Sequence, residues 1–210
     1  MTVVVSIERD GAASARTGLE LCVAAGGVAI FPADGLYGLA CDPLNPDAIG
    51  RIHRIKGRDD GKPSAVLYFS PLAMRELLES LDEGSRAAIG ALLPGPLTLV
   101  VPNPEHRYPL ACREDPERLG VRLIDGPLEG AMCPLFQTSA NRSGEPAPAL
   151  FADIPREVLS GVDVAIDGGP LTGSPSTVVD LTEFEASREW SVLREGAVPV
   201  SDLAERLREL

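Results

Sequence analysis

Short apolar blocks separated by Gly, Pro and polar residues recur along the whole chain, and they predict an alternation of short strands and helices. Runs of β-branched and apolar residues bounded by turn formers predict strands. The expected strands cover residues 3–5, 28–31, 65–69, 97–101, 120–124, 135–138, 162–166, 177–181 and 190–193. Ala- and Leu-rich segments, and apolar residues spaced by three or four, predict helices. The expected helices cover residues 12–25, 71–81, 84–93 and 201–210, with a further helix that begins at Pro46.

Capping residues mark several of these boundaries. Asn45 is a favourable N-cap, and Pro46 suits the first position of the helix that follows. Gly26 ends the first long helix, and Ser201 is expected to cap the last one. Within residues 33–44, small and apolar residues alternate with turn-forming residues, and this pattern predicts a turn-rich loop.

The order of these elements predicts the fold class. Strands and helices are interleaved, which is typical of α/β proteins. Several strands near the C-terminus are joined by turns too short for a helical crossover, so parallel and antiparallel pairs are expected together. We therefore expect one domain over residues 1–210, built on a twisted, open, mixed sheet that is flanked by helices and has a concave ligand-binding face.

The charge of the chain limits its partners. The 210 residues carry a formal charge of −12, whereas a protein that clamps nucleic acid usually presents a broad basic face. Any anion site must therefore be local. No run approaches the roughly 18 apolar residues of a membrane span, and the N-terminal residues lack the pattern of a signal peptide. We expect no membrane segment.

The cysteines indicate a reducing compartment. Cys22, Cys41, Cys112 and Cys133 are far apart and form no C-x-x-C pair. With only two histidines in the chain, these thiols predict no zinc site. Scattered free thiols suit the cytosol, so a cytoplasmic location is expected.

Both lysines of the chain lie in one short segment. Lys56 and Lys62 flank Arg58, and all other cations of the chain are arginines. Lysine provides a compact charge on a flexible stem, which suits a phosphate or carboxylate that moves during a reaction. Lys56 and Arg58 are therefore candidates for a polyphosphate clamp. The alternative is that basic residues here complement the dipole of a helix C-terminus, and the sequence leaves both interpretations open.

A second polar cluster follows the strand expected at residues 135–138. Thr138, Ser139 and Asn141 provide hydroxyls and an amide at the point where that strand ends. Ligands of open α/β sheets bind just beyond strand ends, and such a turn can offer backbone N–H groups to an anion. The alternative is an ordinary turn, which the pattern favours when taken alone because Ser and Asn are turn formers.

Two arginines lie in or at the end of apolar strands. An unpaired charge within a strand is unfavourable, so Arg122 is expected to have an anionic partner, either a protein carboxylate or a substrate. Arg194 either pairs with Glu195 or another carboxylate, or binds a ligand. Ser176 and Thr177 also lie at a strand boundary.

The usual nucleophile and nucleotide signatures are missing. The sequence has no G-x-S-x-G elbow, no Walker loop and no G-x-G-x-x-G turn. We therefore expect chemistry that needs little from protein acids and bases. Positioning and electrostatic stabilisation of phosphates would provide most of the rate.

In their order along the chain, these segments resemble the YrdC-like family of threonylcarbamoyl-adenylate synthases, over residues 27–196. The family pattern comprises a P-T-x-T-x-Y-G-L loop, a K-x-R motif, a P-G-P-x-T turn, an arginine strand, an S-x-N motif, an S-T-x-x-D strand and a late R-x-G. The matching segments are residues 32–39, 56–58 and 94–98, Arg122, and residues 139–141, 176–180 and 194–196.

The resemblance implies an enzyme that condenses L-threonine, bicarbonate and ATP to threonylcarbamoyl-adenylate and releases pyrophosphate. A separate tRNA threonylcarbamoyl transferase machinery would then modify an adenosine of tRNA. Mg²⁺ would arrive with ATP, because phosphates supply most of its ligands, and no metal site of the protein's own is expected. The implied nucleotide-binding residues are Lys56, Arg58, Thr138, Ser139, Asn141 and Arg194, of which Lys56, Arg58, Ser139 and Asn141 are the candidate catalytic residues. The implied substrate-binding residues are Tyr37, Lys62, Arg122, Ser176 and Thr177.

The first motif departs from the family pattern. Ala33 and Gly35 replace both threonines of the loop that lines the amino-acid pocket in the family, and Asp34 remains acidic between them. Because two hydroxyls are missing, we expect weaker discrimination of threonine from serine or valine than in members with the full loop. Restoring Thr at Gly35 is expected to sharpen this selectivity. The chain resembles the short form of the family, without a further C-terminal domain.

The sequence leaves two other functions open. The first is a neighbouring enzyme that forms carbamoyl-adenylate, or the carbamoyl-adenylate of another amino acid, as the altered loop permits. The second is a non-catalytic RNA-binding module of the same fold, with a weak contact to tRNA through Lys56, Arg58 and Lys62. If the chain is an enzyme, Lys56→Ala or Arg58→Ala is expected to weaken ATP binding and adenylate formation far more than stability, because exposed cations contribute little to folding.

Overall fold

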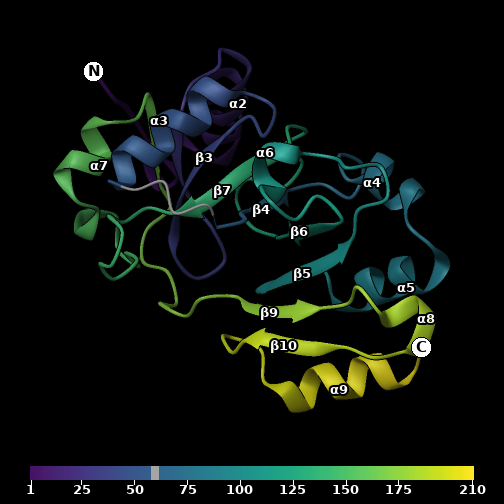
Figure 1. The fold of residues 1–210 in the computed structure, drawn as a ribbon. Coiled ribbons are helices and arrows are strands. Elements are labelled where there is room, and N and C mark those ends of the chain that lie inside the picture. Colours follow the sequence, from purple (N-terminus) through teal and green to yellow (C-terminus); the bar gives the residue numbers. More distant parts are fainter. Residues whose placement is uncertain (58–61) are drawn as a thin grey trace.

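The computed structural model describes residues 1–57 and 62–210. Within them, ten strands form one continuous sheet (Figure 1). The strands are β1 (Val3–Ser6), β2 (Ala29–Pro32), β3 (Tyr37–Cys41), β4 (Ala65–Tyr68), β5 (Leu97–Pro102), β6 (Arg118–Leu123), β7 (Leu135–Ser139), β8 (Val164–Asp167), β9 (Thr177–Asp180) and β10 (Ser191–Arg194). Their spatial order is β1-β8-β2-β3-β7-β4-β6-β5-β9-β10.

The sheet is mixed, as the sequence predicted. The parallel pairs are β1 with β8, β2 with β8, β4 with β6, and β5 with β9. The antiparallel pairs are β2 with β3, β3 with β7, β4 with β7, β5 with β6, and β9 with β10. Most neighbours in the sheet are distant in the sequence, so the centre of the sheet brings together segments from the whole chain.

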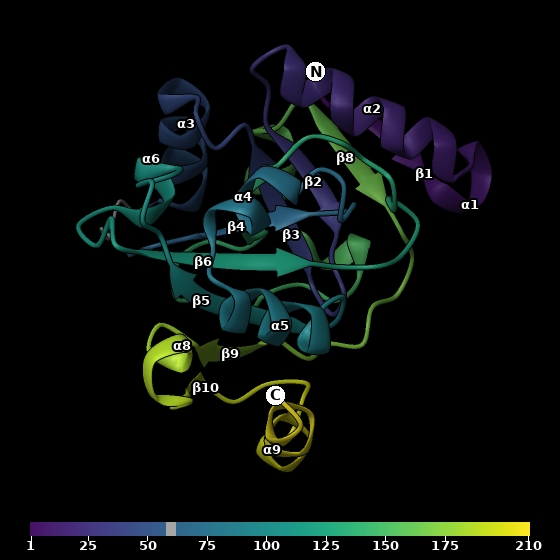
Figure 2. The same ribbon diagram turned by 90° about the vertical axis from the view of Figure 1, so that its right-hand side faces the viewer.

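Helices flank the sheet and lie at both of its ends. They are α1 (Ile7–Asp10), α2 (Ala12–Ala24), α3 (Pro46–Lys56), α4 (Arg75–Ser80), α5 (Glu83–Leu92), α6 (Pro109–Cys112), α7 (Arg156–Ser160), α8 (Phe184–Ser187) and α9 (Val200–Arg208), with a short 3₁₀ helix at Phe151–Asp153. Helix α2 packs on β1, β2 and β8, whereas α5 packs on β5 and against α8 and α9. Figure 2 shows α2 and α9 at opposite ends of the molecule. No helix in the described part of the chain is long and apolar enough to cross a membrane.

Side-chain alternation gives the sheet two apolar faces. In β2, Ile30 packs into the larger core cluster with α3 and α5, whereas Phe31 packs into the smaller cluster beneath α2. In β4, Val66 and Leu67 divide between the two clusters in the same way. This follows from the period of two along a strand. The face beneath α2 is the one that continues into the ligand-sized cavity described below.

Helix α3 begins where the sequence predicts. The Asn45 side chain accepts hydrogen bonds from the amides of Asp47 and Ala48, at 3.1 and 3.0 Å, and Pro46 occupies the first turn. The helix ends at Gly57, whose φ of +72° is favourable for glycine. These caps place Lys56, the last residue of α3, beside the sheet.

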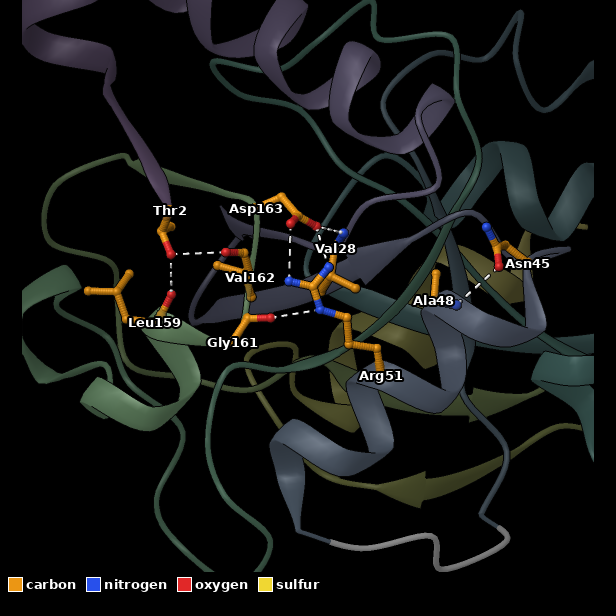
Figure 3. Close-up of polar contacts among 9 residues, drawn as sticks. All are labelled: Thr2, Val28, Asn45, Ala48, Arg51, Leu159, Gly161, Val162 and Asp163. Carbon is orange, nitrogen blue, oxygen red and sulfur yellow. Dashed lines mark hydrogen bonds and ion pairs between the residues drawn. The ribbon is translucent and has the colours of Figure 1, made fainter.

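A polar network ties α3 to the sheet (Figure 3). The Arg51 guanidinium donates to both carboxylate oxygens of Asp163, at 2.6 and 3.1 Å, and to the carbonyl of Gly161 at 2.9 Å. The same carboxylate accepts from the amide of Val28 at 2.9 Å. Burial raises the pKa of Asp163, but the hydrogen bonds from Arg51 and Val28 outweigh this effect and hold the pKa below its ordinary value.

Three expectations about local structure were wrong. Residues 33–44 contain strand β3, because the small residues in this segment pack in the middle of the sheet and are buried there. Ser201 lies inside α9, which begins at Val200 with Pro199 in the cap position. The helix expected from residue 71 begins only at Arg75. Propensity alone did not indicate the short helices α6 and α7.

Candidate active site

A cavity of about 560 Å³ lies against the sheet where the cover of α2 ends. Alternate residues of the strands form its floor. In β6, Arg118, Gly120 and Arg122 line the cavity, whereas Leu119 and Val121 point into the larger core. The floor between the charged residues is built from small or compact side chains, among them Ala65, Val100, Gly120 and Val178. These small side chains leave an open surface on the sheet, and charged side chains lie at the edges of that surface.

Arg122 has the anionic partner that its burial requires. Its Nη2 lies 2.6 Å from Oδ1 of Asp34, and its Nη1 donates to Oε1 of Gln137 at 3.2 Å. The side chains of Arg122 and Asp34 are only 7% and 16% exposed. Among the described residues, neither the Arg122 Nε–H group nor Oδ2 of Asp34 has a hydrogen-bond partner. The partner is thus a protein carboxylate, and the pair retains unused donor and acceptor capacity.

Arg194 forms a second cationic group at the edge of the same cavity. Its Nη2 donates to the carbonyl of Ser176 at 2.7 Å and to the Ser176 hydroxyl at 3.0 Å, and its Nε donates to the same carbonyl at 3.3 Å. The Ser176 and Thr98 hydroxyls are 2.8 Å apart. Burial and the nearby charge of Arg122 lower the pKa of Arg194. The two guanidinium groups therefore repel each other across the cavity, and an anion between them would offset this repulsion.

The candidate phosphate residues Lys56, Ser139 and Asn141 contact one another, and Ser139 among them lines the larger cavity. Nζ of Lys56 donates to the carbonyl of Ser139 at 2.6 Å, and it lies 3.0 and 3.1 Å from the carbonyl and Oδ1 of Asn141. The Ser139 hydroxyl donates to Oδ1 of Asn141. In return, the Ser143 amide donates to the carbonyl of Lys56 at 3.0 Å. The end of α3 and the turn after β7 are thereby tied into one unit.

This geometry corrects one premise of the sequence interpretation. Lys56 is 5% exposed, so it is not a surface cation complementing a helix dipole. Removing it would leave the buried carbonyl of Asn141 and the half-buried carbonyl of Ser139 without this donor, so substitution is expected to affect stability as well as ligand binding. Arg58, the second cation of the K-x-R motif, lies outside the described residues.

Lys62 and Thr138 border a smaller cavity of about 120 Å³. Lys56 and His53 also line it, and Pro63, Ser64 and Thr138 line both cavities. The two lysines of the chain therefore lie on one side of a shared wall, and Arg122 and Arg194 lie in the larger cavity on the other side.

The side chains of two predicted substrate residues are hydrogen-bonded within the protein, although Tyr37 is among the residues that line the larger cavity. The Tyr37 ring is fully buried, and its hydroxyl donates to the carbonyl of Gly169 at 2.7 Å and accepts from the amide of Gly168 at 3.0 Å. Burial raises the pKa of this hydroxyl to about 12. Thr177 is also fully buried and donates to the carbonyl of Val198 at 2.8 Å. Ser176 lines the cavity, so its neighbour Thr177 must face the opposite side of the sheet.

Several cavity residues were not singled out from the sequence. Arg118 lies at the far end of the cavity from Arg122. It forms an ion pair with Asp180, and its Nε lies 3.8 Å from Oδ2 of Asp115. The period-two spacing of Arg118, Gly120 and Arg122 is a signal that could have identified Arg118. Asp34 gave no such signal, because its contact with Arg122 joins residues 88 positions apart.

The cavity has a positive balance in an acidic chain. Three arginines and two aspartates line it among the described residues, whereas the whole chain carries −12. In the part of the chain that the structure describes, no group of three or more His, Cys, Asp or Glu side chains could hold a metal ion. The site is therefore suited to an anionic ligand of moderate size.

Comparison with known proteins gives a consistent match over most of the chain. Residues 22–196 match the Sua5_yciO_yrdC family model, described as telomere recombination. The chain is 34% identical over 170 residues to the threonylcarbamoyl-AMP synthase of Chromohalobacter salexigens, which covers 78% of this chain and 90% of that protein. It is 30% identical over 182 residues to a protein of Methanocaldococcus jannaschii described as a putative threonylcarbamoyl-AMP synthase, covering 85% of this chain and 84% of the relative.

Solved structures with the same fold include one with a bound amino acid. The structure of Pyrococcus abyssi Sua5 complexed with L-threonine superposes with a TM-score of 0.82 at 27% identity. The match covers 98% of this chain, which spans 60% of the length of the Pyrococcus protein. YciO from E. coli superposes with a TM-score of 0.78 over 97% of this chain and 98% of its own, and at 23% identity this likeness concerns the fold alone.

Proposed function

The chain belongs to the Sua5/YciO/YrdC family, as its motifs predicted, and on this basis we propose that it is a threonylcarbamoyl-AMP synthase. The proposed reaction condenses L-threonine, bicarbonate and ATP to threonylcarbamoyl-AMP, with release of pyrophosphate and water. It makes the protein an ATP-dependent nucleotidyltransferase. The product would supply a separate machinery that transfers the threonylcarbamoyl group to tRNA.

The observation that carries this proposal is that two cationic regions adjoin each other, because Pro63, Ser64 and Thr138 line both cavities. Arg122 and Arg194 lie in the larger cavity, and the buried Lys56 lines the smaller one and holds Ser139, which lines the larger cavity, together with Asn141. A carboxylate or carbamate suits the first region, because guanidinium groups bind planar anions through parallel N–H donors. A polyphosphate suits the second. Threonylcarbamoyl-AMP formation needs these two anion sites next to each other.

At the phosphate region, Lys56 would act mainly through its charge and by fixing the turn. Its ammonium group already lies within hydrogen-bond distance of oxygens of Ser139 and Asn141, so it holds the 139–141 turn in one conformation. A turn fixed in this way can present its polar groups to a triphosphate without reorganisation during the reaction. Arg58 and Lys62 are proposed as the further cations of the clamp, and Mg²⁺ would enter as the magnesium complex of the ATP substrate.

At the amino-acid region, the Arg122 and Arg194 pair would hold the anionic end of threonine or its carbamate. Burial and repulsion from Arg122 lower the pKa of Arg194, and an anion bound between the two guanidinium groups would relieve the repulsion. The Thr98 and Ser176 hydroxyls, 2.8 Å apart, provide neutral donors beside it. Holding the carbamate oxygen in line with the α-phosphorus would let it displace pyrophosphate without a protein nucleophile. That fits the absence of nucleophile motifs in the sequence.

The proposal is tested by pyrophosphate release from ATP and bicarbonate with each amino acid in turn. We expect release with L-threonine to exceed release with any other amino acid. Arg194→Met should lower kcat/KM for threonine by about tenfold or more, because a charged hydrogen-bonding group is lost. The matched control is Arg188→Met, since Arg188 stacks on Phe184 away from the cavity. Equal activity of the two variants, or a different preferred amino acid, would contradict the proposal.

A further inference from the structure

A segment at residues 171–176, here called the strap, packs directly on residues 33–36, here called the substrate loop. The Gly173 amide donates to the carbonyl of Gly35 at 2.9 Å. The start of the strap is fixed by the Leu171 amide, which donates to the carbonyl of Ala149 at 2.9 Å. Its end is fixed by the Arg194 guanidinium on the carbonyl of Ser176. The strap is therefore anchored at both ends and in its middle.

The contact leaves no room for a side chain at position 35. A Cβ atom on Gly35 would lie 2.0 Å from the carbonyl oxygen of Ser174, and 3.1 Å from both the Ser174 carbonyl carbon and the Thr172 hydroxyl. The first of these distances is far below van der Waals contact, and the atom it meets is backbone. A side chain at position 35 and the strap in this position exclude each other. The strap main chain occupies the volume that a side chain of the substrate loop would otherwise fill.

The strap brings its own hydroxyl to the site. Ser174 lines the larger cavity, as do Ala33 and Asp34 of the substrate loop. Within the described part of the chain, the Ser174 hydroxyl makes no hydrogen bond, whereas Ser176 on the same strap is engaged by Arg194 and Thr98. Ser174 is half-buried, so a small ligand could reach its hydroxyl. The substrate loop itself offers the Ala33 methyl group, the Asp34 carboxylate and the apolar Leu36 to the cavity, and no hydroxyl.

We propose that Ser174 is a specificity-determining residue of this chain, which hydrogen-bonds the side-chain hydroxyl of the amino-acid substrate. The inference rests on the proposed function and names the group that selects the amino acid. A site that donates or accepts a hydrogen bond from a substrate hydroxyl rejects an analogue that lacks it, because the polar group of the site is then left unpaired. The Ala33 methyl group and Gly35 cannot make this distinction, and the Asp34 carboxylate already accepts from Arg122 through Oδ1.

The decisive experiment compares Ser174→Ala with Thr172→Val in pyrophosphate release with L-threonine and with L-valine. Thr172 is on the same strap and exposed, and it does not line the cavity. Its hydroxyl accepts a long hydrogen bond, 3.5 Å, from the Ser174 amide, so Thr172→Val controls for effects that act through the backbone of the strap. We expect Ser174→Ala to lower kcat/KM for threonine by about three- to tenfold, the range of one lost hydrogen bond, with valine unchanged within about twofold. Thr172→Val should change neither value by more than about twofold.

The outcomes separate this inference from the proposed function. An equal loss with both amino acids, or no loss with threonine, would overturn the role of Ser174. If the unmodified protein releases no pyrophosphate with any amino acid, the proposed synthase activity fails instead. The role of Ser174 is then decided by the melting temperature: threonine should raise it less in Ser174→Ala than in the unmodified protein, whereas an equal rise in both proteins would overturn the role.

Discussion

The carboxylate of Asp34 lies 2.6 Å from the guanidinium group of Arg122, and this ion pair joins the substrate loop to strand β6 at the centre of the sheet. The contact is monodentate, because Nε of Arg122 and Oδ2 of Asp34 have no partners among the described residues. A bidentate arrangement would be stronger. The pair therefore stabilises the loop, while the Nε–H group of Arg122 has no acceptor among the described residues.

Asp34→Asn tests how much of the stability depends on this pair. Arg122 is only 5% exposed, and removing the charge opposite it leaves a buried cation without compensation. We expect the free energy of unfolding to fall by about 3 kcal/mol in a urea titration. The matched control is Asp115→Asn, whose side chain is 48% exposed and lies 3.8 Å from Arg118. The control should change stability by less than about 1 kcal/mol, and equal effects of both variants would show that burial of the first pair is unimportant.

Lys56→Ala should reduce stability as well as ATP binding. The buried ammonium group satisfies the carbonyls of Ser139 and Asn141, which lose their donor in the variant. We expect a loss of about 2 kcal/mol in the free energy of unfolding. Arg54→Ala, an exposed position on the same helix, should change it by less than about 0.5 kcal/mol. A Lys56→Ala protein as stable as the unmodified one would contradict the structural role of the ammonium group.

Substitution of Gly35 should damage the substrate loop, in contrast to the expectation from sequence that Thr at this position sharpens selectivity. Even the Cβ of Ala would lie 2.0 Å from the Ser174 carbonyl oxygen. We expect Gly35→Ala to cost about 2 kcal/mol or more, as overpacking does, and Gly35→Thr to cost more. Gly90→Ala in helix α5 is the control, since a Cβ there has no neighbour within 4 Å. It should be neutral or stabilising by up to about 1 kcal/mol. Thermal unfolding distinguishes the two glycines.

Asp163→Asn should have an effect that depends on pH. The pKa of Asp163 is below its ordinary value in the folded protein, so its ionised form stabilises the fold above the unfolded pKa of about 3.9. This contribution is lost as the pH falls through the folded pKa. We expect the variant to be less stable than the unmodified protein near neutral pH, and the difference to shrink as the pH falls below about 4. A difference that stays constant down to the acid transition would show that the charge on Asp163 is not what joins it to Arg51.

Local patterns predicted much of this structure. Asn45 and Pro46 marked the start of α3 because capping is decided by a few adjacent residues. The interleaving of strands and helices predicted the mixed sheet. The period of two also decides which residues can share a face: Ser176 lines the cavity, so the adjacent Thr177 cannot. That rule, applied to the sequence, would have removed Thr177 from the candidate site.

Contacts between distant segments of the chain could not be predicted from local sequence patterns. The sequence showed that Arg122 needs an anion, but not that Asp34 in another loop provides it. Gly35 appeared as the loss of a threonine, whereas the structure relates it to the Ser174 carbonyl on the strap. Strand β3 was missed because its burial between β2 and β7 outweighs the turn-forming tendency of its small residues.

The central claim is that this protein joins threonine, bicarbonate and ATP in one product. The most direct test is mass spectrometry of the nucleotide formed from MgATP, L-threonine and isotopically labelled bicarbonate. We predict an adenylate that contains both the threonine and the labelled carbon, and that forms only when all three substrates are present. An adenylate without the label, or one that forms equally well without threonine, would contradict the claim and identify a different adenylate-forming activity.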